Sequence, residues 1–422
     1  MSDSYEGGDP VTKNRMVWTA LLLVIVVSCV VYFRYFSQLS RFPEEKGSIT
    51  EKMEVWIYSD GWKPLLEEYQ AVHPEVDLSI RMFRTYDNLY EAFEAALSAH
   101  TAPQMVELEN SYGLAQLIEM NALQPVAPSD ASLHDSIPAI REAFVYQNRQ
   151  WAVPAGISVP VLLYNQELIS WGGRNDALPF DNLRSLAQSV KSWERDLENR
   201  NSKAMWEQGL GVSEGDLPLL FMNLWEHEEQ SSRAERLTAL LQMWHSLVYD
   251  DGVMDPLRHH LAASDFIIGK TLFYFSTSDE IPWFERYIAG NFAYGMLPLP
   301  GTALARVTPR ISSFAITADT GNDEHAKNII HYLSSVEVQG NVFQSTGYLP
   351  VHQEALAHLR QNQGLSSKYK LLFEWDDDLI IPTSAANDRY RWEAITETLH
   401  TLEVDPNADL AALQSKLLPY MP

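Results

Sequence analysis

The sequence predicts an α/β protein whose body folds as two lobes. From residue 53 onward, apolar residues alternate between the spacing of a strand and the spacing of a helix. The chain has 422 residues, more than one growing hydrophobic core usually serves, so each half is expected to bury its own interior. A hydrophobic content of 46%, with 12 Trp, 19 Tyr and 16 Phe, excludes wholesale disorder.

The first part of the body follows a strand–helix order that repeats. The predicted elements are a strand at 53–57, a helix at 65–72, a strand at 76–82, a helix at 89–97 and a strand at 105–108. Pro74 ends the first helix, because proline lacks the N–H that a helix needs. This order predicts a parallel sheet covered by helices, with any ligand at the carboxyl ends of its strands.

The second part begins with an apolar strand at 159–165, after a predicted hinge at Pro154-Ala155-Gly156. The further elements that we expect are helices at 183–190, 217–225 and 237–244, and strands at 271–275, 292–297 and 311–317. Residues 194–208 are charged and polar, which is typical of a solvated helix or loop. Helices are expected to dominate from there to the C-terminus.

An apolar segment precedes the body. Residues 16–33 read MVWTALLLVIVVSCVVYF, eighteen residues without a charge, which rise about 27 Å as a helix at roughly 1.5 Å per residue. That length nearly matches the hydrocarbon layer of a bilayer. We therefore expect a transmembrane or signal-anchor helix here, with residues 1–15 as a polar tail and residues 34–51 as a polar spacer.

Two other processing routes remain open for this segment. Val26-Val27-Ser28-Cys29 resembles a lipobox, after which Cys29 would become a lipidated N-terminus. The apolar run, however, continues to Phe33, where lipoproteins usually have a polar tether. A cleaved signal peptide is the other alternative. Basic residues flank both ends of the segment, so charge does not settle its orientation.

Charge and motif content argue against several classes of protein. With 31 Lys+Arg and 56 Asp+Glu, the formal charge is 31 minus 56, or −25, which excludes a basic nucleic-acid binder. Cys29 is the one cysteine, so no intramolecular disulfide forms. No GxGxxG, GxxxxGK[ST], HExxH or CxxC pattern occurs, which argues against nucleotide enzymes and zinc proteases.

Candidate metal ligands are weak. His259 and His260 are neighbours, and adjacent positions of a helix point in different directions. The acidic runs 250–255 and 376–378 are more typical of solvated turns than of a calcium site. The sequence therefore suggests no metal, no cofactor and no catalytic residue.

Four short blocks occur in an order that is informative. They are Thr85-Tyr86-Asp87 with the later TAPQMV of 101–106; WAVP of 151–154 running into VPVLLYN of 159–165; FIIGKT of 266–271; and 326–333 with Gln339 and the TGYLPV of 346–351. Together they resemble family 1 extracellular solute-binding proteins of ABC importers over about residues 52 to 402. The pattern is nearer to glycerol-3-phosphate and maltose-type binders than to metal or amino-acid binders.

The resemblance implies a two-lobe α/β fold of the periplasmic-binding-protein type II class with three hinge crossings, preceded here by one transmembrane helix. The crossings are expected near 154–160, 296–301 and 346–351. Lobe 1 would comprise 52–157 plus 301–346, and lobe 2 would comprise 158–300 plus 347–422.

The resemblance also suggests which side chains line the ligand cleft. The candidates are Tyr86, Glu109, Asn110, Ser158, Ser276, Trp283, Arg310, Tyr348 and Arg391. Aromatic faces would cover the C–H surfaces of a sugar, while polar groups would fix its hydroxyls. For three of these candidates there is a structural alternative. Tyr86 would pack in the core, Ser158 would be a hydroxyl of a turn, and Trp283 would fill the interior of its lobe.

Two candidates are cationic. The fork of Arg391 suits a phosphate or a carboxylate. Arg310 stands where many relatives carry glycines, so it either narrows the cleft, anchors an anion or forms a surface salt bridge. Asn110 also departs from relatives of the phosphoglycerol type, which often carry Glu there.

The implied function is that of a substrate-binding subunit of an ABC importer. It would capture a sugar, polyol or sugar phosphate by lobe closure, without catalysis, and deliver it to permease subunits. The ATPase must be separate because the chain has no P-loop. The body would lie in the periplasm or extracellular space, tethered through residues 16–33.

Two alternatives stay open. A membrane-anchored sensor or scaffold using the same fold would explain the departures at Asn110 and Arg310. The second alternative is a sugar hydrolase. Such an enzyme uses two carboxylates that the fold brings together, so their spacing in the sequence does not exclude it.

Overall fold

Two β-sheets organise the body of the chain. Their strand orders are β2-β1-β3-β11-β6 and β10-β7-β9-β8. The structure is a computed structural model, and it describes residues 51–422 apart from 172–177, 179, 228–231, 302–306, 319, 322, 363–365, 374–378 and 383. The acidic run 376–378 and the predicted segment 16–33 lie outside the described residues.

The five-stranded sheet contains the strands that the first part of the sequence predicts. Its members are β1 (Glu51–Ile57), β2 (Val76–Met82), β3 (Met105–Glu109), β6 (Val153–Ser158) and β11 (Arg310–Ile316). β1 pairs with β3 in parallel, whereas β11 runs antiparallel to both β3 and β6. We call this sheet and its covering helices lobe 1. The antiparallel β11 places Arg310 beside the carboxyl end of β3.

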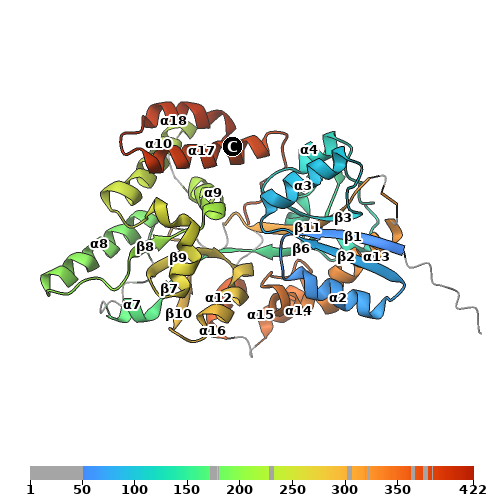
Figure 1. Cartoon of the computed structure of the whole chain (residues 1–422), viewed down its shortest axis with the longest axis horizontal. Coiled ribbons are helices and arrows are strands. Elements are labelled where there is room, and N and C mark those ends of the chain that lie inside the picture. Colours follow the sequence, from blue (N-terminus) through green and yellow to red (C-terminus); the bar gives the residue numbers. More distant parts are fainter. Residues whose placement is uncertain are drawn as a thin grey trace, which may run out of the picture. The chain divides into compact units, whose positions relative to one another are not determined.

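Helices cover both faces of this sheet (Figure 1). Helices α2 (Trp62–Val72), α13 (Asp323–Ser334) and α14 (Val336–Thr346) lie on one face, and α3 (Tyr86–Ser98) and α4 (Leu114–Glu119) lie on the other. Thr85 caps α3, since its side chain accepts a hydrogen bond from the Asn88 N–H at 3.2 Å. The cap fixes where the helix starts, so Tyr86 lies at the first turn.

Small elements link α4 to β6. They are α5 (Ala131–His134), α6 (Pro138–Glu142) and the two-residue strands β4 (Val145–Tyr146) and β5 (Arg149–Gln150).

The four-stranded sheet, with its helices, forms lobe 2. Its strands are β7 (Pro160–Asn165), β8 (Gln208–Gly211), β9 (Thr271–Thr277) and β10 (Tyr294–Leu297). β8 is a strand that the sequence pattern did not predict. Of residues 194–208, the first six end a helix, 200–207 form a loop and Gln208 begins this strand. Its two glycines leave no apolar alternation, and pairing with β9 provides the order instead.

Helices surround this second sheet. They are α7 (Gln166–Trp171), α8 (Leu183–Asn199), α9 (Leu217–His227), α10 (Arg233–His245), α11 (Ala262–Ile267) and α12 (Ile281–Ile288), with the 3-10 helices η1 (Glu214–Asp216) and η3 (Pro256–Leu261). The C-terminal helices are α15 (Gln353–Gln361), α16 (Ser367–Lys370), α17 (Asp388–Val404) and α18 (Leu410–Leu417). α17 packs against α9 and α18, whereas α15 packs against α14 of lobe 1.

The strand orders show that the chain passes between the two sheets twice, and we call the segment 346–351, which begins at the last residue of α14, the third passage. The first passage is at Val159, between β6 and β7, and the second lies between β10 and β11. At the third, the Ile157 N–H donates to the Leu349 carbonyl at 3.0 Å, and the Leu349 N–H donates back at 2.7 Å. The predicted hinge Pro154-Ala155-Gly156 lies within β6, where it pairs with β11. The first and third passages are therefore hydrogen-bonded to each other.

Within the described part of the chain, no helix is both long enough and apolar enough to cross a membrane.

Candidate functional site

A buried carboxylate holds the loop that follows β1. Glu107 of β3 is fully buried and accepts hydrogen bonds from the backbone N–H groups of Tyr58 and Ser59 at 2.8 and 3.0 Å. The Trp62 indole and the Ser312 hydroxyl also donate to it, at 3.1 and 2.7 Å. Burial raises the pKa of Glu107 to about 7, against the lowering effect of these donors. Glu107 therefore fixes the position of this loop.

Tyr348 extends this arrangement from the third passage. Its ring is fully buried and stacks on Trp62, with 5.3 Å between ring centroids. Its hydroxyl lies 2.8 Å from the Ser59 Oγ. Gly156 allows the ring to approach, because a Cβ at this position would lie 2.6 Å from the Tyr348 Cβ. Tyr348 thus links the first and third passages to the β1 loop.

Arg310 connects the two lobes. It lies at the start of β11 in lobe 1, and its Nη2 is 2.7 Å from the Asp216 Oδ1 of lobe 2. Its Nε lies 3.4 Å from the Glu109 Oε2, and Nη1 is 3.5 Å from the Thr277 Oγ1. Burial alone would lower the pKa of Arg310, but Glu109 and Asp216 raise it well above its ordinary value. The guanidinium therefore stays charged between carboxylates of opposite lobes.

Two more carboxylates of lobe 2 face this cation. Asp279 accepts hydrogen bonds from the hydroxyls of Ser158 and Thr277, the latter at 2.6 Å. Glu280 accepts from the Ser276 hydroxyl at 2.7 Å. Burial, followed by the charges of Asp216 and Asp279, raises the pKa of Glu280 to about 8, so its carboxyl is protonated at neutral pH.

Aromatic side chains form the wall at the start of α3. The Tyr86 hydroxyl donates to the Tyr112 carbonyl at 2.9 Å, and the ring lies against Tyr58 and Tyr112. Tyr112 in turn donates its hydroxyl to Asp87. Tyr58 donates to Glu109 at 2.9 Å, which joins the aromatic wall to the Arg310 cluster.

Asn110 and Arg391 lie at a small cavity of about 30 Å³ beside Arg310. The Asn110 amide donates to the Pro309 carbonyl at 3.1 Å and accepts from the Ile311 N–H at 2.7 Å. Arg391 is held by Asp388 at 2.7 Å and by the Tyr420 carbonyl at 2.9 Å. Both side chains thus have partners within the chain.

Trp283 lies apart from these residues. Its side chain is 38% exposed, and its ring contacts Phe284 and Tyr287 of its own helix α12. It lines neither the small cavity nor the groove described below. We call the contacts around Arg310, Glu107 and Tyr348 the interlobe network. Tyr86, Glu109, Ser158, Ser276, Arg310 and Tyr348 belong to it, and Asn110 and Arg391 lie at its edge.

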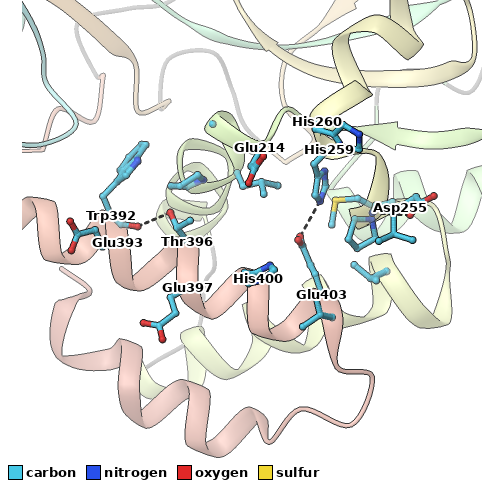
Figure 2. A pocket seen from close by; sticks show the side chains of 18 of the residues that line it. Glu214, Asp255, His259, His260, Trp392, Glu393, Thr396, Glu397, His400 and Glu403 are labelled. Carbon is cyan, nitrogen blue, oxygen red and sulfur yellow. Dashed lines mark hydrogen bonds and ion pairs between the residues drawn. The ribbon is translucent and has the colours of Figure 1, made fainter. Parts of the chain in front are cut away.

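A much larger groove opens beside this network. Its volume is about 1500 Å³, and its walls come from α3 and Tyr112 of lobe 1 and from η1, η3 and α17 of lobe 2. Figure 2 shows Trp392, Thr396, His400 and Glu403 along α17, with His259 and Glu214 on the opposite side. Tyr112 and Trp392 meet across the lobes, with 6.0 Å between ring centroids.

A buried ion pair closes one end of this groove. The His259 ring lies 2.9 Å from the Val212 carbonyl through Nδ1 and 3.3 Å from the Glu403 carboxylate through Nε2. Because both ring nitrogens face acceptors, the geometry favours the doubly protonated imidazolium. The Trp244 indole also donates to Glu403, at 2.8 Å. The pair holds η3 against α17 and so shapes the groove wall.

Sequence reasoning missed the buried carboxylate of Glu107, three carboxylates around Arg310 and the aromatic pair of the groove. Asp279 and Glu280 come shortly after the strand predicted at 271–275, so the rule that ligands gather at strand ends pointed to them. Asp216 had no such signal, because it follows β8, the strand that was not predicted. Trp392 carried no motif of its own beyond its place next to Arg391.

Within the described ranges, no group of three or more His, Cys, Asp or Glu side chains is positioned to hold a metal ion. The side chains instead suit a polar organic molecule, with aromatic faces, carboxylates and hydroxyls converging from both lobes.

Comparison with known proteins gives a family and a fold. A family model described as bacterial extracellular solute-binding protein matches residues 65–368. A tagatose-bound solute-binding protein of an ABC transporter from Thermotoga lettingae aligns with a TM-score of 0.73 at 14% identity, covering 88% of this chain and 99% of that chain. A maltose-bound protein from T. maritima aligns with a TM-score of 0.72 at 16% identity, covering 87% and 98%.

A protein from Mycobacterium tuberculosis in complex with glycerophosphocholine aligns with a TM-score of 0.69 at 16% identity, covering 87% of this chain and 96% of that chain. At these identities, the matches establish the two-lobe α/β fold.

Proposed function

The chain belongs to the bacterial extracellular solute-binding protein family, and we propose on that basis that it captures a sugar or polyol between its two lobes for an ABC importer. The bound solute stays chemically unchanged. It is then delivered to permease subunits that are powered by a separate ATPase, with the body lying in the periplasm or extracellular space. Phosphorylated polyols belong to the same class of candidates.

The observation that carries this proposal is the groove of about 1500 Å³ whose walls come from both lobes. A receptor of this kind needs contacts that are complete only when the lobes are shut, since a ligand shifts the equilibrium by its differential affinity alone. Tyr112 of lobe 1 and Trp392 of lobe 2 both line the groove, so a ligand there could contact an aromatic face of each lobe. Solved proteins of the same fold bound to tagatose and maltose support a carbohydrate ligand.

We further propose that the lobes move about the three passages near 154–160, 296–301 and 346–351. Residues 16–33 would anchor the chain to the membrane. Mass measurement of the mature N-terminus tests this, because a helical anchor leaves residues 16–28 in place, whereas an acyl anchor leaves a chain that begins at a lipidated Cys29.

Binding of carbohydrates tests the function. We expect the purified full-length chain to be stabilised against heat by at least one sugar or polyol in a panel that includes tagatose, maltose and glycerol phosphates. Replacing Trp392 by alanine should weaken that binding about 30-fold, because losing one aromatic contact to the ligand costs about 2 kcal/mol. A thermal melt measures the stabilisation, and isothermal titration calorimetry measures the two affinities.

Trp283→Ala is the matched control, since this tryptophan lies outside the groove and should leave the affinity unchanged. Absence of any response across the panel, or equal affinities for the two tryptophan variants, would reject the proposal.

A further inference from the structure

The point where the two lobes meet is occupied by a guanidinium. Arg310 extends from lobe 1 and lies 2.7 Å from Asp216 and 3.5 Å from the Thr277 hydroxyl, both of which belong to lobe 2. On its own lobe it faces Glu109 at 3.4 Å. A side chain thus makes the interlobe contact that a bound solute makes in a receptor that closes on its ligand.

The carboxylates around this guanidinium exceed its charge. Glu109, Asp216, Asp279 and Glu280 all interact electrostatically with Arg310, so the cluster carries four potential negative charges against one positive charge. Burial raises the pKa of Glu109, Asp216 and Glu280, and the charge of Arg310 opposes that rise at each of them. Burying unbalanced charge is costly. An added cation would therefore stabilise the closed arrangement, and an added anion would destabilise it.

The surroundings of Arg310 also have unused hydrogen-bonding capacity. The Thr308 hydroxyl is 95% buried, has no hydrogen-bond partner, and lines the cavity of about 30 Å³ next to Arg310. The Arg310 Nε, although close to Glu109, makes no hydrogen bond of good geometry. Removing the guanidinium would enlarge this cavity into a polar slot between carboxylates.

We propose that Glu109 and Asp216 form a cation subsite between the lobes, which Arg310 fills from within the chain and which the guanidino or ammonium group of a small organic solute fills in its place. The proposal rests on the solute-binding function and specifies its ligand class. A solute whose recognised group is cationic takes this subsite, while its polar body lies in the adjoining groove. A phosphate group would instead face the surplus carboxylates.

Chemical rescue of an Arg310→Ala variant tests the subsite. The full-length variant is heated with methylguanidinium chloride or with N-methylurea, a neutral molecule of similar shape, each at 10 mM and equal ionic strength. We expect methylguanidinium to raise the melting temperature by about 1–2 °C and N-methylurea by less than about 0.3 °C. The wild-type chain should respond less to methylguanidinium, because Arg310 already occupies the subsite.

A second substitution assigns the response to the proposed carboxylates. In the Asp216→Asn/Arg310→Ala variant, rescue should fall at least tenfold in apparent affinity. Equal effects of methylguanidinium and N-methylurea, or undiminished rescue in the double variant, would overturn the proposal. If Arg310→Ala does not fold, Arg310→Gln provides the same comparison with the charge removed and the hydrogen-bonding side chain kept.

The outcome is separable from that of the sugar-binding experiment. Binding of neutral sugars without rescue by methylguanidinium would leave the receptor function standing and reject the cation subsite. Rescue without any sugar binding would leave the cation subsite standing and reject a neutral sugar or polyol as the solute.

Discussion

Replacing Gly347 by alanine is expected to lower the free energy of unfolding by about 3 kcal/mol or more. Gly347 ends α14 at φ +77°, a left-handed conformation that costs an L-residue about 1–2 kcal/mol. A Cβ at this position would also lie 2.6 Å from the Asp279 carbonyl and 2.8 Å from the Pro282 Cδ. Moving the Asp279 backbone to relieve this contact would disturb lobe 2. The alanine should therefore displace the third passage away from lobe 2. Urea denaturation measures the loss.

Gly290→Ala is the matched control. Gly290 has nearly the same φ, +79°, but nothing lies within 4 Å of the position of its Cβ. It should therefore cost only the conformational strain, about 1 kcal/mol. Equal losses in the two variants would show that the contact between the third passage and lobe 2 is not tight.

Replacing Trp62 by alanine should cost about 3–5 kcal/mol of stability. The side chain is fully buried, stacks on Tyr348, and donates its indole N–H to Glu107 and Ser312. Its loss leaves a large cavity and takes a donor from a buried carboxylate. Trp62→Phe should fall between wild type and alanine, because it keeps most of the packing but not the donor. Chemical denaturation followed by circular dichroism measures all three.

Trp283→Ala again serves as the reference, with an expected cost of less than about 1 kcal/mol at its partly exposed position. A Trp62→Ala variant as stable as Trp283→Ala would contradict the role given to Trp62 beneath the β1 loop.

Local patterns predicted most of the secondary structure. For example, the alternation of Val76, Leu78 and Ile80 predicted a strand, and these residues lie in β2. The patterns failed where a segment becomes a strand because a neighbouring strand pairs with it, and not because of its own residues. β8 contains two glycines in four residues and forms because β9 lies alongside it. Pro154, Ala155 and Gly156, a hinge by composition, complete a strand because β11 pairs with them.

The site, too, was predictable only in part, because its contacts join distant parts of the chain. Family resemblance directed attention to Tyr348, Ser158 and Arg310, which the fold brings to the interlobe network. Their partners could not be derived from the sequence, since the contact of Arg310 with Asp216 spans 94 residues and two lobes. Whether Arg310 anchors an anion or narrows the cleft depends on the carboxylates around it, and those become apparent only in three dimensions.

The central claim is that the two lobes close on a solute, and a distance measurement across the lobes tests it most directly. Spin labels attached at Lys63→Cys of α2 and Glu198→Cys of α8, both exposed positions on different lobes, report the separation in a Cys29→Ser background. Pulsed electron paramagnetic resonance is then recorded with and without the sugar that binds most tightly. We predict that the sugar changes the distance distribution and narrows it to a single closed state. Identical distributions, with binding confirmed in the same sample, would contradict the claim.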